Sequence, residues 1–175
     1  MKTRELILAG LLAAIIAVMA PWSLPLPLVP ITLQTLIIPI VASIANTKIS
    51  WAAIVVYLLL GIVGLPVFAG GASGLAVMFG PTGGYLWGML VFPLIISSLM
   101  AQQRNLATLI GANLLAAIIQ LAIGAGWLVL ASKGMDWQTG LTVGMLAFIV
   151  PAIIKVALVT MVTVMIARSM KLPLQ

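Results

Sequence analysis

The sequence lacks cysteine and histidine, and its only acidic residues are Glu5 and Asp136. These absences exclude disulfides, a Cys/His metal site and a histidine general base. Charge is scarce, because Lys, Arg, Asp and Glu make up 6% of the 175 residues, whereas 64% are hydrophobic and the mean hydropathy is +1.34. About a quarter of the residues in an ordinary soluble domain are charged. The composition therefore excludes a soluble or disordered chain and favours a membrane protein.

The positive charges are scattered along the chain and form no continuous basic surface of the kind that binds nucleic acid. They give a net charge of +6. No Gly-x-x-x-x-Gly-Lys-Ser/Thr motif is present, so the chain is not itself a P-loop ATPase. No Asp, His or Cys lies within the apolar runs, and the serines show no spacing typical of a nucleophile. We therefore expect no enzyme activity, no cofactor or metal site and no nucleic-acid partner.

Six apolar runs account for most of the chain, at residues 6–20, 31–45, 51–66, 85–100, 106–131 and 141–167. A membrane-spanning helix needs about 20 predominantly apolar residues. The runs are continuous rather than alternating, which indicates helices and not a β-barrel. We therefore predict an all-α integral membrane protein in contact with membrane lipid, in which residues 1–175 form one domain of six transmembrane helices.

Two segments between the runs have distinctive compositions. Residues 21–30 are proline-rich and predict an extended linker, because proline lacks an N–H and fixes φ. Residues 70–84 are glycine-rich and predict a loop between the third and fourth helices. Irregular backbone at membrane depth is tolerated only against protein or a water-filled cavity. We therefore expect the glycine-rich loop to border a binding pocket.

The first run has an alternative interpretation as a cleaved signal peptide. Lys2 and Arg4 form a basic start, and residues 18–20 resemble a small-residue cleavage site. Against this interpretation, Glu5 is acidic and cleavage would fall directly before Pro21. We favour a retained helix.

The cations predict the orientation of the six spans. With the N-terminus inside, the outer loops carry only Lys133, which Asp136 offsets. The cytoplasmic side then carries Lys2, Arg4, Lys48, Arg104, Arg168 and Lys171. Because cytoplasmic loops are enriched in Lys and Arg, we expect a multi-pass protein of the cell membrane with both termini in the cytoplasm.

Lys155 lies well inside the sixth run. A lysine at this depth costs about 2.5–3.5 kcal/mol on insertion scales and normally has a carboxylate partner. Glu5 and Asp136 both lie in predicted boundary regions, so we expect the partner to be a carboxylate on a small solute. The alternatives are a lysine that snorkels to the interface and a buried neutral lysine.

Small and polar residues suggest further contacts. Ala9, Ala13 and Ala17 share one helix face, where a partner helix or internal packing could use the close approach that alanine permits. Gly80, Gly84 and Gly88 repeat the spacing. Thr32 and Gln34 are placed to hydrogen-bond an amide-like solute or another helix. Tyr85, Asn113 and Gln120 are further polar residues in or near the spans.

Three motifs carry a resemblance to a known family: VPITLQT at 29–35, LLLGIVGLPVFAGG at 58–71 and GPTGGY at 80–85. In this order they closely resemble the BioY family, the biotin-specific membrane subunits (S components) of energy-coupling factor (ECF) transporters. The resemblance implies six helices, an outward-facing pocket with high affinity for biotin, and uptake powered by partners. Those partners are a transmembrane coupling subunit and two cytoplasmic ATPases.

The resemblance also implies roles for individual residues. Lys155 would bind the biotin carboxylate, Phe68 would pack on the apolar part, and Ala9, Ala13 and Ala17 would contact the coupling subunit. The ring system would be recognised by Gln34, Tyr85 and the backbone of residues 70–74. The substrate-binding residues expected on these grounds are Thr32, Gln34, Phe68, Gly71, Ala72, Tyr85 and Lys155.

The sequence departs from the family pattern at three polar positions. Ala152 stands where the family often has an acid three residues before the lysine. Ala72 and Leu86 stand where some members have Asn and Arg. Two alternatives therefore stay open: an S component for another small carboxylated vitamin, and a membrane scaffold subunit in which Lys155 pairs with an acid of its neighbour.

Overall fold

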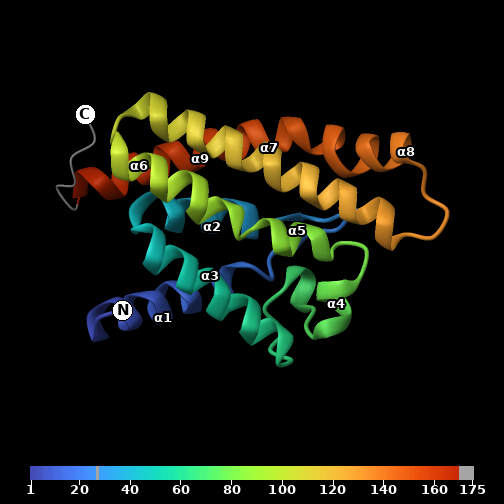
Figure 1. Ribbon diagram of the computed structural model, residues 1–175, viewed down its shortest axis with the longest axis horizontal. Coiled ribbons are helices and arrows are strands. Elements are labelled where there is room, and N and C mark those ends of the chain that lie inside the picture. Colours follow the sequence, from blue (N-terminus) through green and yellow to red (C-terminus); the bar gives the residue numbers. More distant parts are fainter. Residues whose placement is uncertain (27, 170–175) are drawn as a thin grey trace.

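Each apolar run forms helix in the computed structural model, which describes residues 1–26 and 28–169 (Figure 1). The first three helices are α1 (Thr3–Met19), α2 (Gln34–Ile44) and α3 (Thr47–Ile62). The fourth run comprises α5 (Gly83–Gly88), a π-type turn η2 (Pro93–Ser97) and α6 (Ser98–Gln102). The fifth is α7 (Leu106–Ala131), and the sixth comprises α8 (Trp137–Leu141), a second π-type turn η3 (Thr142–Leu146) and α9 (Ala147–Ser169).

Within the described ranges, three helical segments are long and apolar enough to cross a membrane: Gly83–Gln102, Leu106–Ala131 and Trp137–Ser169. Short polar stretches precede two of these segments, and a side chain in each stretch caps the helix that follows. Asn105 accepts a hydrogen bond from the Thr108 amide at the start of α7. Asp136 accepts one from the Thr139 amide at the start of α8, and this bond lowers the pKa of the Asp136 carboxyl. Asp136 is therefore a capping residue at the end of a helix, remote from Lys155 in the next helix.

The proline-rich linker is extended, as its composition predicts, and it also forms a two-stranded antiparallel ribbon. β1 (Ser23–Leu24) pairs with β2 (Ile31–Thr32). Pro27, part of the predicted linker, lies outside the described residues. The ribbon matters for the site because it places residues 29–32 directly before α2.

The glycine-rich segment is more structured than a simple loop. It contains a short 3-10 turn η1 (Ala69–Gly71) and the helix α4 (Leu75–Phe79), and α5 begins within it at Gly83. The segment is tied to the rest of the chain by two amides: Gly70 donates to the Pro21 carbonyl and Gly74 to the Gly61 carbonyl. The predicted loop over 70–84 is therefore corrected to a folded connection.

Helix packing is close where small residues occur. α1 packs on α3 and α2, with Ala9 and Ala13 only 3% and 1% exposed and Ala17 partly buried. Ile16, on the same side of α1, is fully buried, so this helix contributes to the main core. In this conformation Ala9 and Ala13 thus pack against the chain itself, and their contact with a coupling subunit stays a prediction.

Polar groups also hold helices together inside the bundle. Ser97 of η2 donates to the Ala42 carbonyl of α2 at 2.7 Å, and the hydroxyls of Ser50 and Ser97 lie 2.9 Å apart. These bonds join α2, α3 and η2 in a region that is otherwise apolar, where an unsatisfied hydroxyl is costly.

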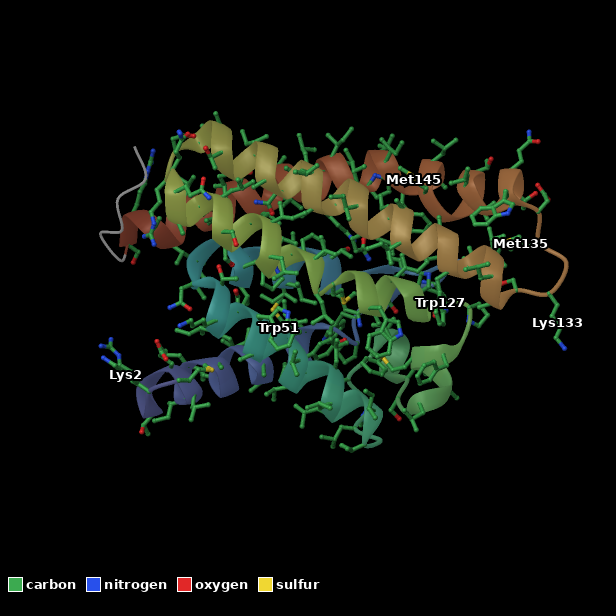
Figure 2. The ribbon with its side chains drawn as sticks, in the orientation of Figure 1. Lys2, Trp51, Trp127, Lys133, Met135 and Met145 are labelled. Carbon is green, nitrogen blue, oxygen red and sulfur yellow. The ribbon has the colours of Figure 1, made fainter. Side chains whose placement is uncertain are left out.

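The two ends of the bundle differ in the elements that they carry. The start of α1 and the end of α9 lie at the same end, whereas Lys133 lies at the other (Figures 1 and 2). Lys171, a predicted cytoplasmic cation, lies outside the described residues.

The contact between α5 and α7 gives a test of the packing. A Cβ at Gly84 of α5 would lie 2.1 Å from the Cβ of Trp127 of α7. A Cβ at Gly111, on the same helix as Trp127, would meet nothing within 4 Å. We expect Gly84→Ala to reduce the free energy of unfolding by about 1–3 kcal/mol through overpacking. Gly111→Ala, the control, should be neutral or stabilising by up to about 1 kcal/mol, because alanine favours helix. Melting of the purified variants in detergent measures both, and equal stability of the two would contradict the packing.

Candidate functional site

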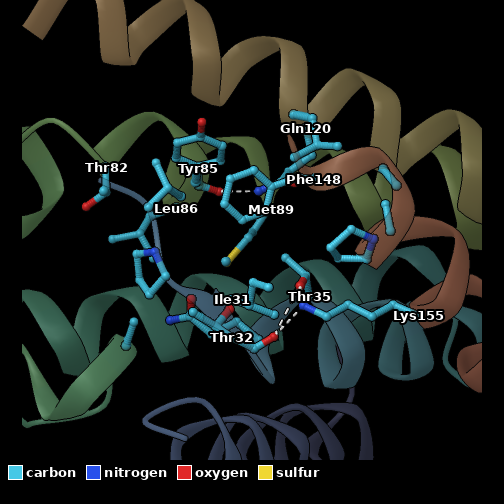
Figure 3. Close-up of a pocket in the computed structure, with 18 of the residues that line it drawn as sticks. Ile31, Thr32, Thr35, Thr82, Tyr85, Leu86, Met89, Gln120, Phe148 and Lys155 are labelled. Carbon is cyan, nitrogen blue, oxygen red and sulfur yellow. Dashed lines mark hydrogen bonds between the residues drawn. The ribbon is translucent and has the colours of Figure 1, made fainter. Parts of the chain in front are cut away.

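A cavity of about 330 Å³ lies between α2, α5, α7 and α9, with the ribbon and the segment after α3 along its sides (Figure 3). Its wall is mainly apolar and includes Phe68, Leu86, Met89, Phe92 and Phe148. A few polar side chains also line the cavity, among them those of Thr35, Gln120 and Lys155. Concave, mainly apolar cavities of about 300–1,000 Å³ with a few polar groups are typical of small-molecule sites.

Lys155 reaches across the cavity from α9 to the start of α2 (Figure 3). Its Nζ donates to the Thr32 carbonyl at 2.7 Å and to the Thr35 hydroxyl. Because an ammonium has three N–H donors, one remains for a ligand. The side chain is half-buried and points inward, which argues against the snorkelling alternative.

No carboxylate of the described residues neutralises Lys155. Glu5 accepts a hydrogen bond from the backbone amide of Lys2, and Asp136 caps α8. The ammonium therefore has neutral oxygen partners only, which hold it in position without cancelling its charge. Such a site attracts an anion of cavity size.

Gln34 lies at the first position of α2 and is 3% exposed. Its Nε2 donates to the Tyr57 hydroxyl at 2.5 Å, and that hydroxyl donates to the Val67 carbonyl at 3.2 Å. The amide thus joins α2 to α3 while Gln34 also lines the cavity. Thr32 contributes through its backbone carbonyl, whereas the sequence directs attention to its side chain.

Tyr85 lines the cavity, but its hydroxyl is already engaged. It donates to the Gly144 carbonyl of η3 at 2.7 Å, while the Tyr85 carbonyl accepts from Gln120 Nε2 at 3.1 Å (Figure 3). That hydroxyl proton therefore joins α5 to η3, and the contact of Tyr85 with a ring system stays a prediction.

The glycine-rich segment supplies wall and few polar contacts. Phe68 and Ala72 line the cavity, whereas Gly71, at φ +77°, is not among the lining residues. The amides of Gly70, Gly71, Ala72 and Gly74 all donate to backbone carbonyls of the protein. These four amide protons are therefore used within the fold, and recognition of a ring by the backbone of residues 70–74 stays a prediction.

Six of the seven expected substrate-binding residues thus line one cavity, and Gly71 does not. Sequence reasoning missed Thr35, the partner of Lys155, because no pattern pairs residues 120 positions apart. It noticed Asn113 and Gln120 but did not assign them to the site. The available signal was a carboxamide within an otherwise apolar run of residues.

The three departures from the family pattern come together in this cavity. Ala72, Leu86 and Ala152 all belong to its wall, although they lie on three different elements. Each presents an apolar side chain there, so the polar character of the cavity depends on other residues.

Comparison with known proteins identifies the class. A model of the BioY family matches residues 1–172. The biotin transporter BioY2 of Lactococcus lactis subsp. cremoris is 40% identical over 171 residues, covering 97% of this chain and 93% of the relative. The biotin transporter BioY of Thermotoga maritima is 33% identical over 165 residues, covering 94% and 96%.

A solved structure agrees with the sequence relatives. The crystal structure of the S-component for biotin from an ECF-type ABC transporter matches with a TM-score of 0.83 and 27% identity, covering 95% of this chain and 92% of that chain. The fold and cavity thus define a membrane protein of the S-component class. The chain belongs to the BioY family.

The structural role of the Tyr85 hydroxyl is testable by stability. Tyr85→Phe removes one buried hydrogen bond and should reduce the free energy of unfolding by about 0.5–1.5 kcal/mol, with the cavity wall preserved. Tyr57→Phe should cost more, because the Tyr57 hydroxyl makes two such bonds. Thermal melting in detergent compares them, and a Tyr85→Phe variant as stable as the wild type would contradict this role.

Proposed function

We propose that this protein captures biotin within the membrane and takes part in its uptake as the substrate-binding subunit of an ECF-type vitamin transporter. Membership of the BioY family, together with relatives named biotin transporters, supports the cargo. The single structural observation that carries the proposal is the cavity, in which Lys155 is the one charged lining residue among those that the structure describes. Biotin is an apolar ring and chain that ends in one carboxylate, which matches one ammonium in an apolar wall.

The charge balance explains why a carboxylate is the expected ligand group. Among the described residues the site holds one positive charge and no carboxylate, and Thr32 and Thr35 fix the position of that charge. A monoanionic cargo would bring the site to neutrality, and an ion pair in a site of low dielectric is far stronger than one in water. A neutral cargo would leave the ammonium buried and unpaired. The inward direction of Lys155 also speaks against a scaffold in which it pairs with a neighbouring subunit.

Removal of the ammonium tests the ligand assignment. We expect Lys155→Met to weaken biotin binding by about 30-fold or more, since loss of one partner of a buried charge pair costs about 2–5 kcal/mol. Binding of biotin methyl ester, which lacks the charge, should change little. Titration calorimetry of the purified protein measures both ligands.

Lys133→Met is the matched control, because Lys133 is exposed and does not line the cavity. It should leave both affinities unchanged. Equal weakening of acid and ester by Lys155→Met would contradict the charge pair, and absence of biotin binding to the wild type would contradict the proposed function.

The membrane arrangement is part of the proposal. We take α1, α2, α3, the segment from α5 to α6, α7, and the segment from α8 to α9 as six spans, with both termini in the cytoplasm and the cavity open outward. The shared end of α1 and α9 and the distribution of cations support this orientation. The ribbon and the folded connection after α3 then lie on the outer side, next to the cavity.

The family resemblance implies a transmembrane coupling subunit and two cytoplasmic ATPases as the partners. Separate ATPase subunits fit a chain in which no Gly-x-x-x-x-Gly-Lys-Ser/Thr motif occurs. For the coupling subunit we propose α1 as the contact helix. Ala9 and Ala13 are buried against the chain itself, so their direct contact would require α1 to move away from its neighbours. Gly10 and Ala14, exposed on the same helix, offer another helix the same close approach.

A bulky residue on that exposed face separates binding from uptake. We expect Ala14→Trp to bind biotin normally, because Ala14 is exposed and does not line the cavity, but to lose uptake. Accumulation of labelled biotin in cells that also produce the coupling subunit and ATPases measures uptake. Ala13→Trp should instead destabilise the protein, because Ala13 is 1% exposed. Normal uptake by Ala14→Trp would contradict this interface.

A second candidate cargo, another small carboxylated vitamin, is favoured by one observation. Ala72, Leu86 and Ala152 all present apolar side chains to the cavity wall, at positions where the family pattern described above has polar groups in some members. Competition of unlabelled carboxylated vitamins with biotin on the purified protein distinguishes the two candidates.

A further inference from the structure

One end of the bundle carries most of the exposed positive charge of the molecule. Its exposed cations belong to the start of α1, the start of α3, the connection from α6 to α7 and the end of α9, and these four segments lie at the same end (Figure 1). The residues are Lys2, Arg4, Lys48, Arg104 and Arg168. At the other end, Lys133 is the one exposed cation among the described residues (Figure 2).

The chain supplies little negative charge to the cationic end. It has two acidic side chains, and Asp136 lies at the other end, where it caps α8. Glu5 accepts a hydrogen bond from the backbone amide of Lys2 at 2.9 Å, in the first turn of α1. Among the described residues, five cations at this end therefore face one carboxylate, and most of the positive charge is left for an outside partner.

Two of the helices that carry these cations expose an apolar side chain one turn further along. Ile7 follows Arg4 by three residues on α1, and Trp51 follows Lys48 by three residues on α3. Residues three apart lie on the same side of a helix, and the rise between them is about 4.5 Å. In both pairs the cation is nearer the end of the bundle, and the exposed apolar side chain is nearer its middle.

The same order recurs on α7 and α9. Met165 precedes Arg168 by three residues near the end of α9, and Leu106 follows Arg104 by two residues at the start of α7. Both apolar side chains are exposed. Because α1 packs on α3 and α7 packs on α9, the four pairs lie on two opposite sides of the bundle (Figure 1).

This order is the one that a bilayer imposes where its hydrocarbon meets its headgroups. Tryptophan is enriched at that level, and Lys and Arg near helix ends extend their charged groups beyond it. The apolar member of each pair fits against an acyl chain, and the cation fits against the phosphate of the same lipid. A protein partner covers one side of a bundle, whereas lipids surround it. The distribution over two opposite sides therefore favours lipid.

We infer that this end of the bundle binds the headgroups of anionic phospholipids, through Arg4, Lys48, Arg104 and Arg168. A Lys or Arg close to an anionic membrane surface strengthens association by about fivefold. Zwitterionic lipids carry the same phosphate but no net charge, so they satisfy the apolar contacts without the electrostatic attraction. This binding is independent of the solute in the cavity and goes beyond the proposed function.

Spin-labelled lipids test the inference on the purified full-length protein in phosphatidylcholine bilayers. The fraction of label that is immobilised at the protein surface is compared for phosphatidylglycerol, which is anionic, and phosphatidylcholine, labelled on the same acyl carbon. We expect phosphatidylglycerol to associate at least about twofold more strongly at low salt. In 1 M NaCl this preference should disappear, because the Debye length falls to about 3 Å.

Substitutions locate the preference on the protein. A variant that combines Arg4→Gln, Lys48→Gln, Arg104→Gln and Arg168→Gln should associate equally with both lipids, and each single substitution should reduce the preference only in part. Two matched controls should keep it in full. Arg4→Lys, Arg104→Lys and Arg168→Lys together retain the charge, and Lys133→Gln removes an exposed cation from the other end.

A wild-type preference that salt and the combined Gln variant both remove, and that both controls keep, supports the inference. Equal association of the two lipids with the wild-type protein at low salt overturns it and assigns the cations to a protein partner. If the combined variant does not fold, the four single variants decide, and an unchanged preference in all of them also overturns the inference. Absence of biotin binding would overturn the proposed function alone.

Discussion

The structure depends on one half-buried ammonium that meets no carboxylate among the residues that the structure describes. Lys155 projects from α9 into the cavity, where the Thr32 carbonyl and the Thr35 hydroxyl hold it. Neutral oxygens position an ammonium but do not cancel its charge, so the site is incomplete without an anion. This constraint links α9 to the start of α2, and it makes the contact between these helices part of the binding site.

The polar groups around the cavity follow a second constraint, which is that few of them are available to a ligand. The Tyr85 hydroxyl and the amides of the glycine-rich segment are used to join elements of the fold. The same is true of the side-chain nitrogens of Gln34, Asn113 and Gln120, which donate to other groups of the protein. A mainly apolar wall with one lysine among its described residues is chemically selective, because each cargo group must match a fixed protein group.

Close helix packing gives the cavity its rigid frame. Gly84 permits Trp127 of α7 to approach α5, and Ala9 and Ala13 bring α1 against α3 and α2. In lipid there is little hydrophobic driving force between helices, so close approach and hydrogen bonds between helices must hold the bundle together. The hydroxyl groups of Ser50 and Ser97 form such hydrogen bonds and join α2, α3 and η2.

The sequence by itself determined where helices form and that the chain belongs in a membrane, because apolar runs and capping residues are local signals. It also singled out Lys155, since a lysine in an apolar run is anomalous wherever the helices pack. Only the tertiary structure decided that Thr35 and the Thr32 carbonyl hold this lysine and that Ala9 and Ala13 face inward. It also decided which groups the side chains of Gln34, Tyr85 and Asn113 bind. Those facts depend on contacts between residues far apart in the chain, and composition and spacing carry no record of which hydrogen-bonding group such a contact uses.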